Sequence, residues 1–419
     1  YNFCRTLDDI ADDDNNLDVK KKIFLKFKKD FESKNLNNQA QLISAKDVNV
    51  TADIINNSKE IIAGNEISIT ANQITNNDTI IAGNKINITA QDHLINNNAK
   101  LESNGFINIA ANNINNQGIL KAVDYINITA NDSVINGIKD ADNSNISMAT
   151  NNYLTIQANN NIDNHAILSA KTILSLNSLK GDINNHHKAE LISSDISNKA
   201  TSQLILQAIN GSINQYSKNS VVVNGNHIIT ANDYNNTGRI DIAGNLTMNI
   251  ANNLINDIGA LIYAGNDMYL NVANDLTNKE DATIYAINDL FITNRALNIA
   301  EQTTLNTLKS EIAASSDNNI IKQKRLEIAN IFDNLKINKL ENISGNIESY
   351  GGDIYIAANI FNNIRSEYRY VEHKTIPGHQ WTDHPDLSSL RRDIIGNIVN
   401  QSIKNLIKER YKGSSTRKK

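Results

Sequence analysis

The chain has 419 residues, a formal net charge of −5 and an isoelectric point near 5.9. This weakly acidic balance argues against a general nucleic-acid binder, which would be basic. Hydrophobic residues make up 40% of the chain but aromatic residues only 5%, so its core must be built from Ile, Leu, Val and Ala. The single cysteine, Cys4, excludes an internal disulfide framework.

Residues 1–36 form a charged N-terminal segment that does not fit the pattern of the rest. An acidic stretch precedes a basic one, in which Ile23, Phe24, Phe27 and Phe31 fall at helical spacing. We expect a helix that covers the first open coil; a basic amphipathic helix for a membrane surface is the alternative. The chain starts at Tyr1 and shows no signal peptide, so we interpret it as a piece of a longer chain.

Residues 37–299 carry a repeat that is clearest between Ser58 and Asn97, where two blocks match almost position by position. Within each block, apolar residues alternate with polar ones, as in Ile67-Ser-Ile69-Thr-Ala71, which predicts a strand with one face inward. Repeats of about twenty residues are typical of solenoids, because one coil cannot bury its apolar face alone. The sequence therefore predicts an all-β fold, a right-handed parallel β-helix.

Glycine and asparagine recur at fixed places in the repeat, where we expect turns. The mechanism we assign is that Asn and Gly tolerate the left-handed backbone region. Asn side chains stacked in successive coils should also bond to one another as a ladder. The predicted structural positions are Gly64, Asn65, Asn76, Asn77, Gly83, Asn84, Asn96, Asn97, Asn115, Asn116, Gly244, Asn245, Gly265 and Asn266.

The repeat is interrupted over residues 300–337, where Leu305, Leu308 and Ile312 are spaced for a helix. We expect a helical insertion, or a helical hairpin, that leans on the solenoid. A last coil follows over 338–364, and a closing loop or strand over 365–386. Residues 387–419 then read as an amphipathic helix with a basic tail. Insertions near 138–150 and 186–202 are expected to bulge out as loops.

No group of side chains predicts catalysis, a cofactor or a metal. The histidines between residues 373 and 384, with Glu372, match no strong zinc spacing, and His186-His187 reads as a surface pair. Enzymes on a β-helix group carboxylates along one groove, whereas the acidic residues here are expected to lie on distant coils. These residues are Asp241, Asp267, Asp289 and Asp353.

Several blocks resemble the filamentous haemagglutinin repeat, whose pattern is hydrophobic-Ala-Gly-Asn/Asp followed by alternating hydrophobic positions. They are IIAGNKINITAQDHLINN from residue 80, IAGNLTMNIANNLIN from residue 242 and YAGNDMYLNVANDLTN from residue 263. The resemblance implies a right-handed parallel β-helix in the shaft of a bacterial exoprotein. It also implies export through an outer-membrane two-partner secretion transporter and exposure at the cell surface, where a host or neighbouring-cell glycan or protein would be the receptor.

The sequence thus predicts roughly 15 coils, which at about 4.8 Å a coil span on the order of 70 Å. We expect the shaft of a haemagglutinin-type adhesin, or of a contact-dependent growth-inhibition toxin, without catalysis. Two other hypotheses remain: a polysaccharide-active enzyme on a β-helix, and a non-exported remnant of a degraded exoprotein gene.

Overall fold

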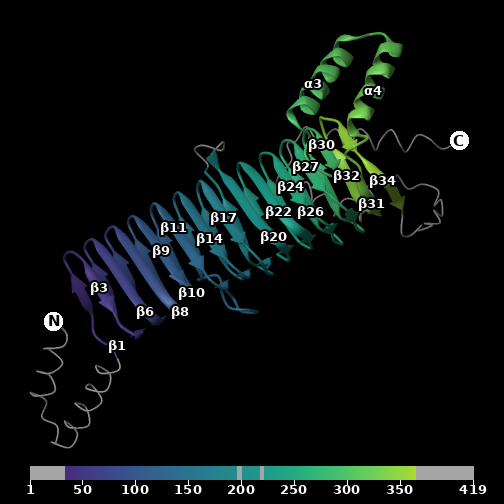
Figure 1. Ribbon diagram of the computed structural model, residues 1–419. Coiled ribbons are helices and arrows are strands. Elements are labelled where there is room, and N and C mark those ends of the chain that lie inside the picture. The colour runs from purple at the N-terminus through teal and green to yellow at the C-terminus, as the bar shows by residue number, and fades with distance from the viewer. Residues whose placement is uncertain (1–33, 196–200, 218–220, 365–419) are drawn as a thin grey trace, which may run out of the picture. The chain divides into compact units, whose positions relative to one another are not determined.

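The computed structural model describes residues 34–195, 201–217 and 221–364. Their strands join into one 34-stranded sheet that winds as a parallel β-solenoid of about 15 turns (Figure 1). The predicted fold class, coils of about twenty residues with one helical insertion, is confirmed. The predicted N-terminal helix, the closing segment 365–386, the C-terminal helix and the group of Glu372 with three histidines lie outside the described residues.

Each coil contributes a strand to each of three faces, which we call the ladder face, the second face and the third face in chain order. The ladder face contains β1 (Asn35–Asn38), β4 (Ile54–Asn57), β12 (Val134–Asn136), β15 (Ile162–Asn164), β18 (Ile183–Asn185), β25 (Leu254–Asn256), β28 (Asp275–Asn278), β31 (Ile337–Ile343) and β34 (Ala358–Ile364).

The second face contains β2 (Leu42–Ser44), β5 (Ile61–Ala63), β7 (Ile80–Ala82), β13 (Ser147–Thr150), β16 (Ile167–Ala170), β19 (Glu190–Ser193), β21 (Val221–Val223), β23 (Arg239–Ile242), β26 (Leu261–Ala264), β29 (Thr283–Ala286) and β32 (Asn346–Ser349). The insertions predicted near 138–150 and 186–202 are therefore only partly loops, because β13 and β19 lie within them.

The third face contains β3 (Val48–Thr51), β9 (Phe106–Ala111), β11 (Tyr125–Ala130), β14 (Tyr153–Ala158), β17 (Ile173–Ser178), β24 (Leu246–Ile250), β27 (Met268–Val272), β30 (Leu290–Thr293) and β33 (Ile354–Ile356). Five longer strands continue round a corner into another face, and β8 passes two corners and contributes to all three faces: β6 (Glu66–Asn76), β8 (Lys85–Ser103), β10 (Asn113–Ala122), β20 (Gln203–Gln215) and β22 (Asn226–Asn236).

The apolar residues of every strand stack in register into one core that runs through the coils. Ile67 and Ile69 are 0% and 1% exposed and lie beside Ile86 and Ile88 of the next coil, whereas the intervening polar residues point outward. Burying one such side chain contributes about 1.5–3 kcal/mol. Each coil depends on its neighbours for this burial, which explains the serial repeat.

The repeat glycines serve close approach between coils rather than an unusual backbone conformation. Among the described glycines, positive φ angles occur at Gly137 and Gly259, and the repeat positions Gly64 and Gly83 are not among them. A Cβ added at Gly83 would lie 2.0 Å from the carbonyl oxygen of Gly64 in the preceding coil. The mechanism predicted for these glycines is therefore wrong: a side chain would collide with the neighbouring backbone, whatever the φ angle.

The predicted asparagine ladder is confirmed, but it lies inside the solenoid. Asn76 and Asn96 end inward-facing stretches of strand, are 0% and 1% exposed, and are joined by an amide–amide hydrogen bond of 2.8 Å. Similar bonds run along the ladder face, and they are also formed where the partners are further apart in sequence, as between Asn136 and Asn164 or between Asn278 and Asn342. The internal ladder comprises Asn38, Asn57, Asn76, Asn96, Asn116, Asn136, Asn164 and Asn185 before one interruption, and Asn236, Asn256, Asn278, Asn342 and Asn363 after it.

Two helices interrupt the coils and form a hairpin (Figure 1), α3 (Ile299–Ala314) and α4 (Asn318–Phe332). Helix α3 begins with a capping box: the Asn298 side chain accepts from the backbone N–H of Glu301, and the Glu301 carboxylate accepts from the Asn298 N–H. Helix α4 has a simpler cap, in which the Asp317 side chain accepts from the backbone N–H of Asn319. The strand register resumes directly afterwards, where β31 pairs with β28.

Candidate functional site: the junction of the hairpin and the solenoid

The base of the hairpin packs on an aromatic row of the third face. Tyr269, Phe291 and Tyr355 occupy the same outward position of β27, β30 and β33, so their rings stack in register. The ring centroids are 5.0 Å apart between Tyr269 and Phe291 and 4.9 Å apart between Phe291 and Tyr355. Such spacing is favourable for aromatic pairs.

The hairpin covers this row with its own apolar side chains. Phe332 at the end of α4 stacks on Tyr355 at 5.1 Å, and Leu305 of α3 belongs to the same buried cluster. Phe291 is only 1% exposed although it points out of the solenoid. The junction is thus a second small core, separate from the core inside the coils, and it fixes the hairpin at its base.

A column of aspartates flanks the aromatic row. Asp267, Asp289 and Asp353 each stand two residues before a ring of the row, at the same turn of successive coils. The backbone N–H of Asp289 donates to Asp267 Oδ1 at 3.2 Å, and the N–H of Asp353 donates to Asp289 Oδ1 at 2.9 Å. The carboxylates of Asp267 and Asp289 therefore also accept from the backbone of the next coil.

Lys309 of α3 connects the hairpin to this column. Its Nζ lies 2.6 Å from Asp289 Oδ2 and 3.3 Å from Asp353 Oδ2, and 5.6 Å from the centre of the Tyr355 ring. Partial burial tends to lower the pKa of Lys309, but the hydrogen bond and charge of Asp289, with the charge of Asp353, outweigh it and raise that pKa. The ammonium group therefore stays charged as the cation of the junction.

The tyrosine hydroxyls complete the arrangement. Tyr355 donates to Asp353 Oδ2 at 2.9 Å, and Tyr269 donates to Asp267 Oδ2 at 3.4 Å. Burial, and then the charge of Asp267, raises the pKa of Tyr269 to about 12; burial and the hydrogen bond to Asp353 raise the pKa of Tyr355 as well. Both phenols remain neutral donors at physiological pH. Together with Lys309 they hold the carboxylates as fixed acceptors, a geometry suited to clamping α3 to the coils.

The expectation that the four acidic residues lie on distant coils is wrong, because successive coils carry them and three of them share one turn. Asp289 and Asp353 are 64 positions apart in sequence, but the hairpin accounts for the excess and the structure places them in adjacent coils. Asp241 alone lies elsewhere, on β23, where Arg239 pairs with it. The pattern Asp-apolar-aromatic-apolar, repeated at 267–270, 289–292 and 353–356, was the sequence signal for this site.

The other predicted positions divide between turns and strands. Gly64, Asn65, Gly83, Asn84, Gly244, Asn245, Gly265 and Asn266 lie at turns, with amide bonds such as Asn266 to Asn245 at 2.6 Å. Asn76, Asn96, Asn115 and Asn116 lie in strands rather than in turns; the ladder residues Asn76, Asn96 and Asn116 are buried, whereas Asn115 is not. Asn77 and Asn97 form an outer pair at 3.1 Å.

The histidine pair is only partly a surface feature. His187 is exposed, but His186 stacks on His165 with ring centroids 3.9 Å apart, and its Nε2 lies 3.2 Å from Asp163 Oδ1. Over residues 34–195, 201–217 and 221–364, no group of three or more candidate metal ligands comes together. The same ranges contain no helix that is both long and apolar enough to cross a membrane.

Comparison with known families adds an independent observation. A family model described as the haemagglutinin repeat matches residues 10–98. This match and the parallel β-solenoid both agree with a filamentous haemagglutinin-type repeat protein. The haemagglutinin repeats matched in this range include the Ser58–Asn97 blocks, which contain the ladder residues Asn76 and Asn96. Searches of curated proteins and of solved structures found no significant match.

Proposed function

We propose that this chain is part of the shaft of a secreted or surface-exposed bacterial exoprotein, which mediates adhesion or presents a terminal toxin domain. The observation that supports this most directly is the uninterrupted pairing of coils along a continuous apolar core, in a chain with haemagglutinin repeats. Such a solenoid resists bending and pulling because every coil hydrogen-bonds to both neighbours. Its proposed export partner is an outer-membrane two-partner secretion transporter.

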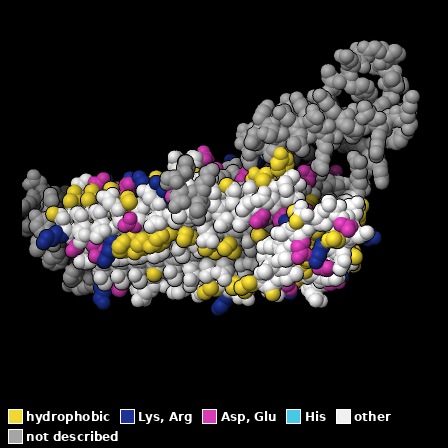
Figure 2. All heavy atoms as spheres, turned by 90° about the horizontal axis from the view of Figure 1, so that it is seen from above, with side chains coloured by type: hydrophobic (Ala, Val, Ile, Leu, Met, Phe, Trp, Pro, Cys, Tyr) yellow, Lys and Arg dark blue, Asp and Glu magenta, His cyan; other side chains and the backbone are white. Residues whose placement is uncertain are grey.

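The outer surface of the shaft suits a structural and interaction role. On the face shown in Figure 2, hydrophobic side chains form narrow rows among charged and other side chains. Rings also stack along the third face: Phe106, Tyr125 and Tyr153 occupy one another's faces at centroid distances of 4.7 and 5.1 Å. These rings therefore stabilise adjacent coils first and offer mainly their edges to the outside.

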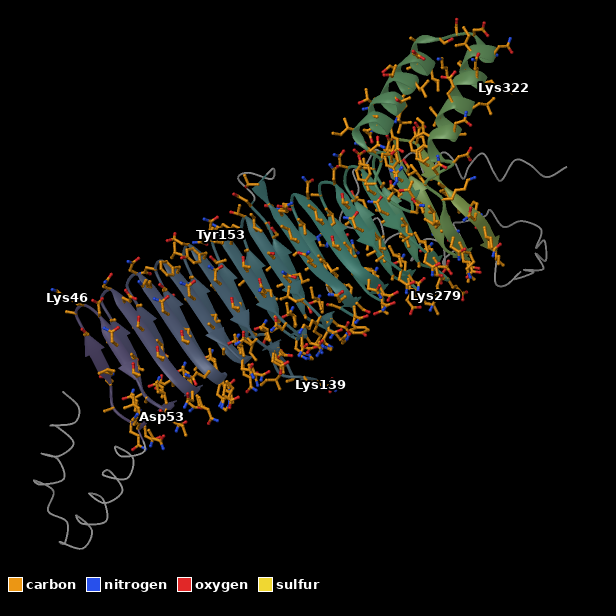
Figure 3. All side chains as sticks on the ribbon, in the orientation of Figure 1. Lys46, Asp53, Lys139, Tyr153, Lys279 and Lys322 are labelled. Carbon is orange, nitrogen blue, oxygen red and sulfur yellow. The ribbon has the colours of Figure 1, made fainter. Side chains whose placement is uncertain are left out.

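Within this proposal, the hairpin is the part of the shaft that we expect to contact a receptor. It departs from the repeat, it is clamped at its base, and it carries polar and charged side chains away from the coils, including Lys322 (Figure 3). Leu326 on α4 is 60% exposed. Replacing Leu326 with Asp should weaken binding of the purified chain to target cells, whereas Ile258→Asp, at a loop residue that is 66% exposed, should not.

The shaft proposal is tested on intact source cells with an antibody against the Ser58–Asn97 blocks. Immunoblots with and without mild protease treatment of the cells are compared, and a cytoplasmic protein serves as the lysis control. A band well above 46.3 kDa that disappears on protease treatment is the expected result. A protected band near 46.3 kDa would overturn surface exposure and favour the non-exported remnant.

A further inference from the structure

Three irregularities of the solenoid coincide at one interface, between β20 and β22. The first is a break in the internal ladder. Gln215 takes the place of asparagine; it accepts from Asn185 at 3.0 Å, but its own amide donates to the carbonyl of Ser217 at 3.3 Å rather than to Asn236. The two halves of the ladder are therefore not joined by an amide–amide bond here.

The second irregularity is a register shift in the same pair of strands. Ala208 pairs with Ala231 and Ser212 with Asp233, so three residues of β20 lie opposite one residue of β22. The extra residues bulge outward, and Ile209 among them is 53% exposed. A bulge interrupts the ladder of backbone hydrogen bonds at that point and reduces the pairing of the two coils.

The third irregularity is a histidine inside the apolar core. His227 pairs in register with Leu204 and Leu246 and is 1% exposed. Its Nδ1 lies 2.9 Å from the carbonyl oxygen of Leu204, so the ring donates there, whereas Nε2 is buried without a hydrogen-bond partner. An unpaired buried acceptor already costs free energy, and a proton on it would place a charge in the core.

We propose that the β20–β22 interface is an acid-sensitive seam, at which protonation of His227 opens the solenoid locally while the coils on either side remain closed. The ladder break and the bulge lower the cost of opening at this interface, and the histidine makes the opening depend on pH. Elsewhere along the ladder face, rungs such as Asn236–Asn256 and Asn256–Asn278, both at 2.8 Å, continue to hold the coils together.

Among the described residues, no charged side chain offsets a positive charge on His227. Its neighbours in register on β20 and β24 are leucines, and no charged side chain of the described residues contributes to its pKa. The other buried titratable group of β22 is Tyr234, a phenol whose pKa is itself raised by burial. Burial lowers the pKa of His227 to about 4, although the hydrogen bond to Leu204 opposes this shift.

The sign and size of the effect follow from linkage. The imidazole has a pKa of about 6.5 when the seam is open and about 4 when it is closed, so opening takes up a proton. The closed seam is at full stability above pH 6.5 and loses stability as the pH falls from 6.5 to 4. Between pH 7.5 and pH 5, the open fraction should rise by roughly thirtyfold.

Hydrogen exchange on the full chain at pH 7.5 and pH 5, corrected for the intrinsic pH dependence of exchange, tests this proposal. Peptides within 203–236 should gain roughly thirtyfold in opening at pH 5, and peptides within 246–290 should change little. His227→Leu, which continues the leucine stack, should abolish the gain. Gln215→Asn should slow exchange at both pH values and leave the ratio between them unchanged.

Two results would overturn the seam. One is faster hydrogen exchange of residues 203–236 at pH 5 that persists in H227L. The acid effect would then not need His227, and the stacked pair His165 and His186 would be the alternative cause. The second result is measured on the wild-type chain, so it does not depend on whether a variant folds. Carbon-13 labelling of the histidine rings should show an imidazole that stays neutral in the folded chain down to about pH 4 and is missing from the spectrum of H227L; if all of them titrate near pH 6.5, His227 is not shielded.

Discussion

The contribution of the internal ladder to stability can be tested by comparing Asn76→Ala, at a buried ladder residue, with Asn77→Ala, at the exposed residue next to it. Asn76 is 0% exposed; it accepts from Asn57 Nδ2 at 2.7 Å and donates to Asn96 Oδ1 at 2.8 Å. Truncation leaves one buried donor and one buried acceptor without a partner, each at about 1–3 kcal/mol. We expect a loss of about 3 kcal/mol in the affected coils. Asn77→Ala, at an exposed residue, should stay within about 0.5 kcal/mol.

The measurement is hydrogen exchange of peptides covering residues 54–97 in the full chain. A long repeat array does not unfold in a single two-state step, so a global midpoint would dilute a local change. A loss of about 3 kcal/mol corresponds to roughly a hundredfold faster opening of these coils. If Asn76→Ala and Asn77→Ala have equal effects, or if distant coils accelerate as much as residues 54–97, the ladder does not stabilise its own coils and the reasoning fails.

Gly83→Ala should destabilise its coil by about 1–3 kcal/mol, because the new Cβ meets the Gly64 carbonyl; Gly351→Ala, whose Cβ would have its nearest contact at 3.4 Å, should be neutral or slightly stabilising. Hydrogen exchange of the peptides around each glycine measures both effects, and equal changes in the two variants would refute the close-approach argument. Lys309→Met should leave the strands intact but speed hydrogen exchange in α3 several-fold, since it removes the cation that bridges two carboxylates. Lys322→Met, on α4 away from the coils, is the control and should have no such effect; comparable acceleration in both variants would show that the clamp contributes nothing.

The fold of this chain could be predicted from periodicity because the same short alternation of apolar and polar residues recurs in coil after coil. The alternation around Ile67 and Ile69 fixes which side chains face inward, and a slip of one residue would expose all of them. Helical spacing likewise predicted the insertion from Leu305 and Leu308, both of which are buried in the structure. In each case the physical cause is local: a period of two for strands, and a period near 3.6 for helices.

The junction could not be predicted in the same way because it depends on which coils become neighbours. Asp289 and Asp353 are 64 residues apart in sequence, yet they lie in adjacent coils. The reason is that the two helices between them form an insertion whose ends lie at the same edge of the solenoid. The role of the glycines was misassigned for a related reason. A collision between Gly83 and the carbonyl of Gly64 exists only once coils are stacked, and no pattern within one coil contains that distance.

The hairpin is attached to the solenoid in a way that leaves the coils independent of it. The Asn278–Asn342 rung spans 64 residues and the Asn256–Asn278 rung spans 22, yet both amide bonds measure 2.8 Å. The chain therefore returns to the same register after the insertion. Loop-closure entropy grows only with the logarithm of loop length, so the longer excursion costs little more than a short turn. The coils do not depend on what is inserted between them, and the specific contacts of the hairpin are confined to its clamped base. We therefore expect an insertion of different length or sequence at this edge to leave the ladder intact, provided that its two ends meet as these do. A repetitive solenoid can in this way carry a distinct surface feature without a change in its coils.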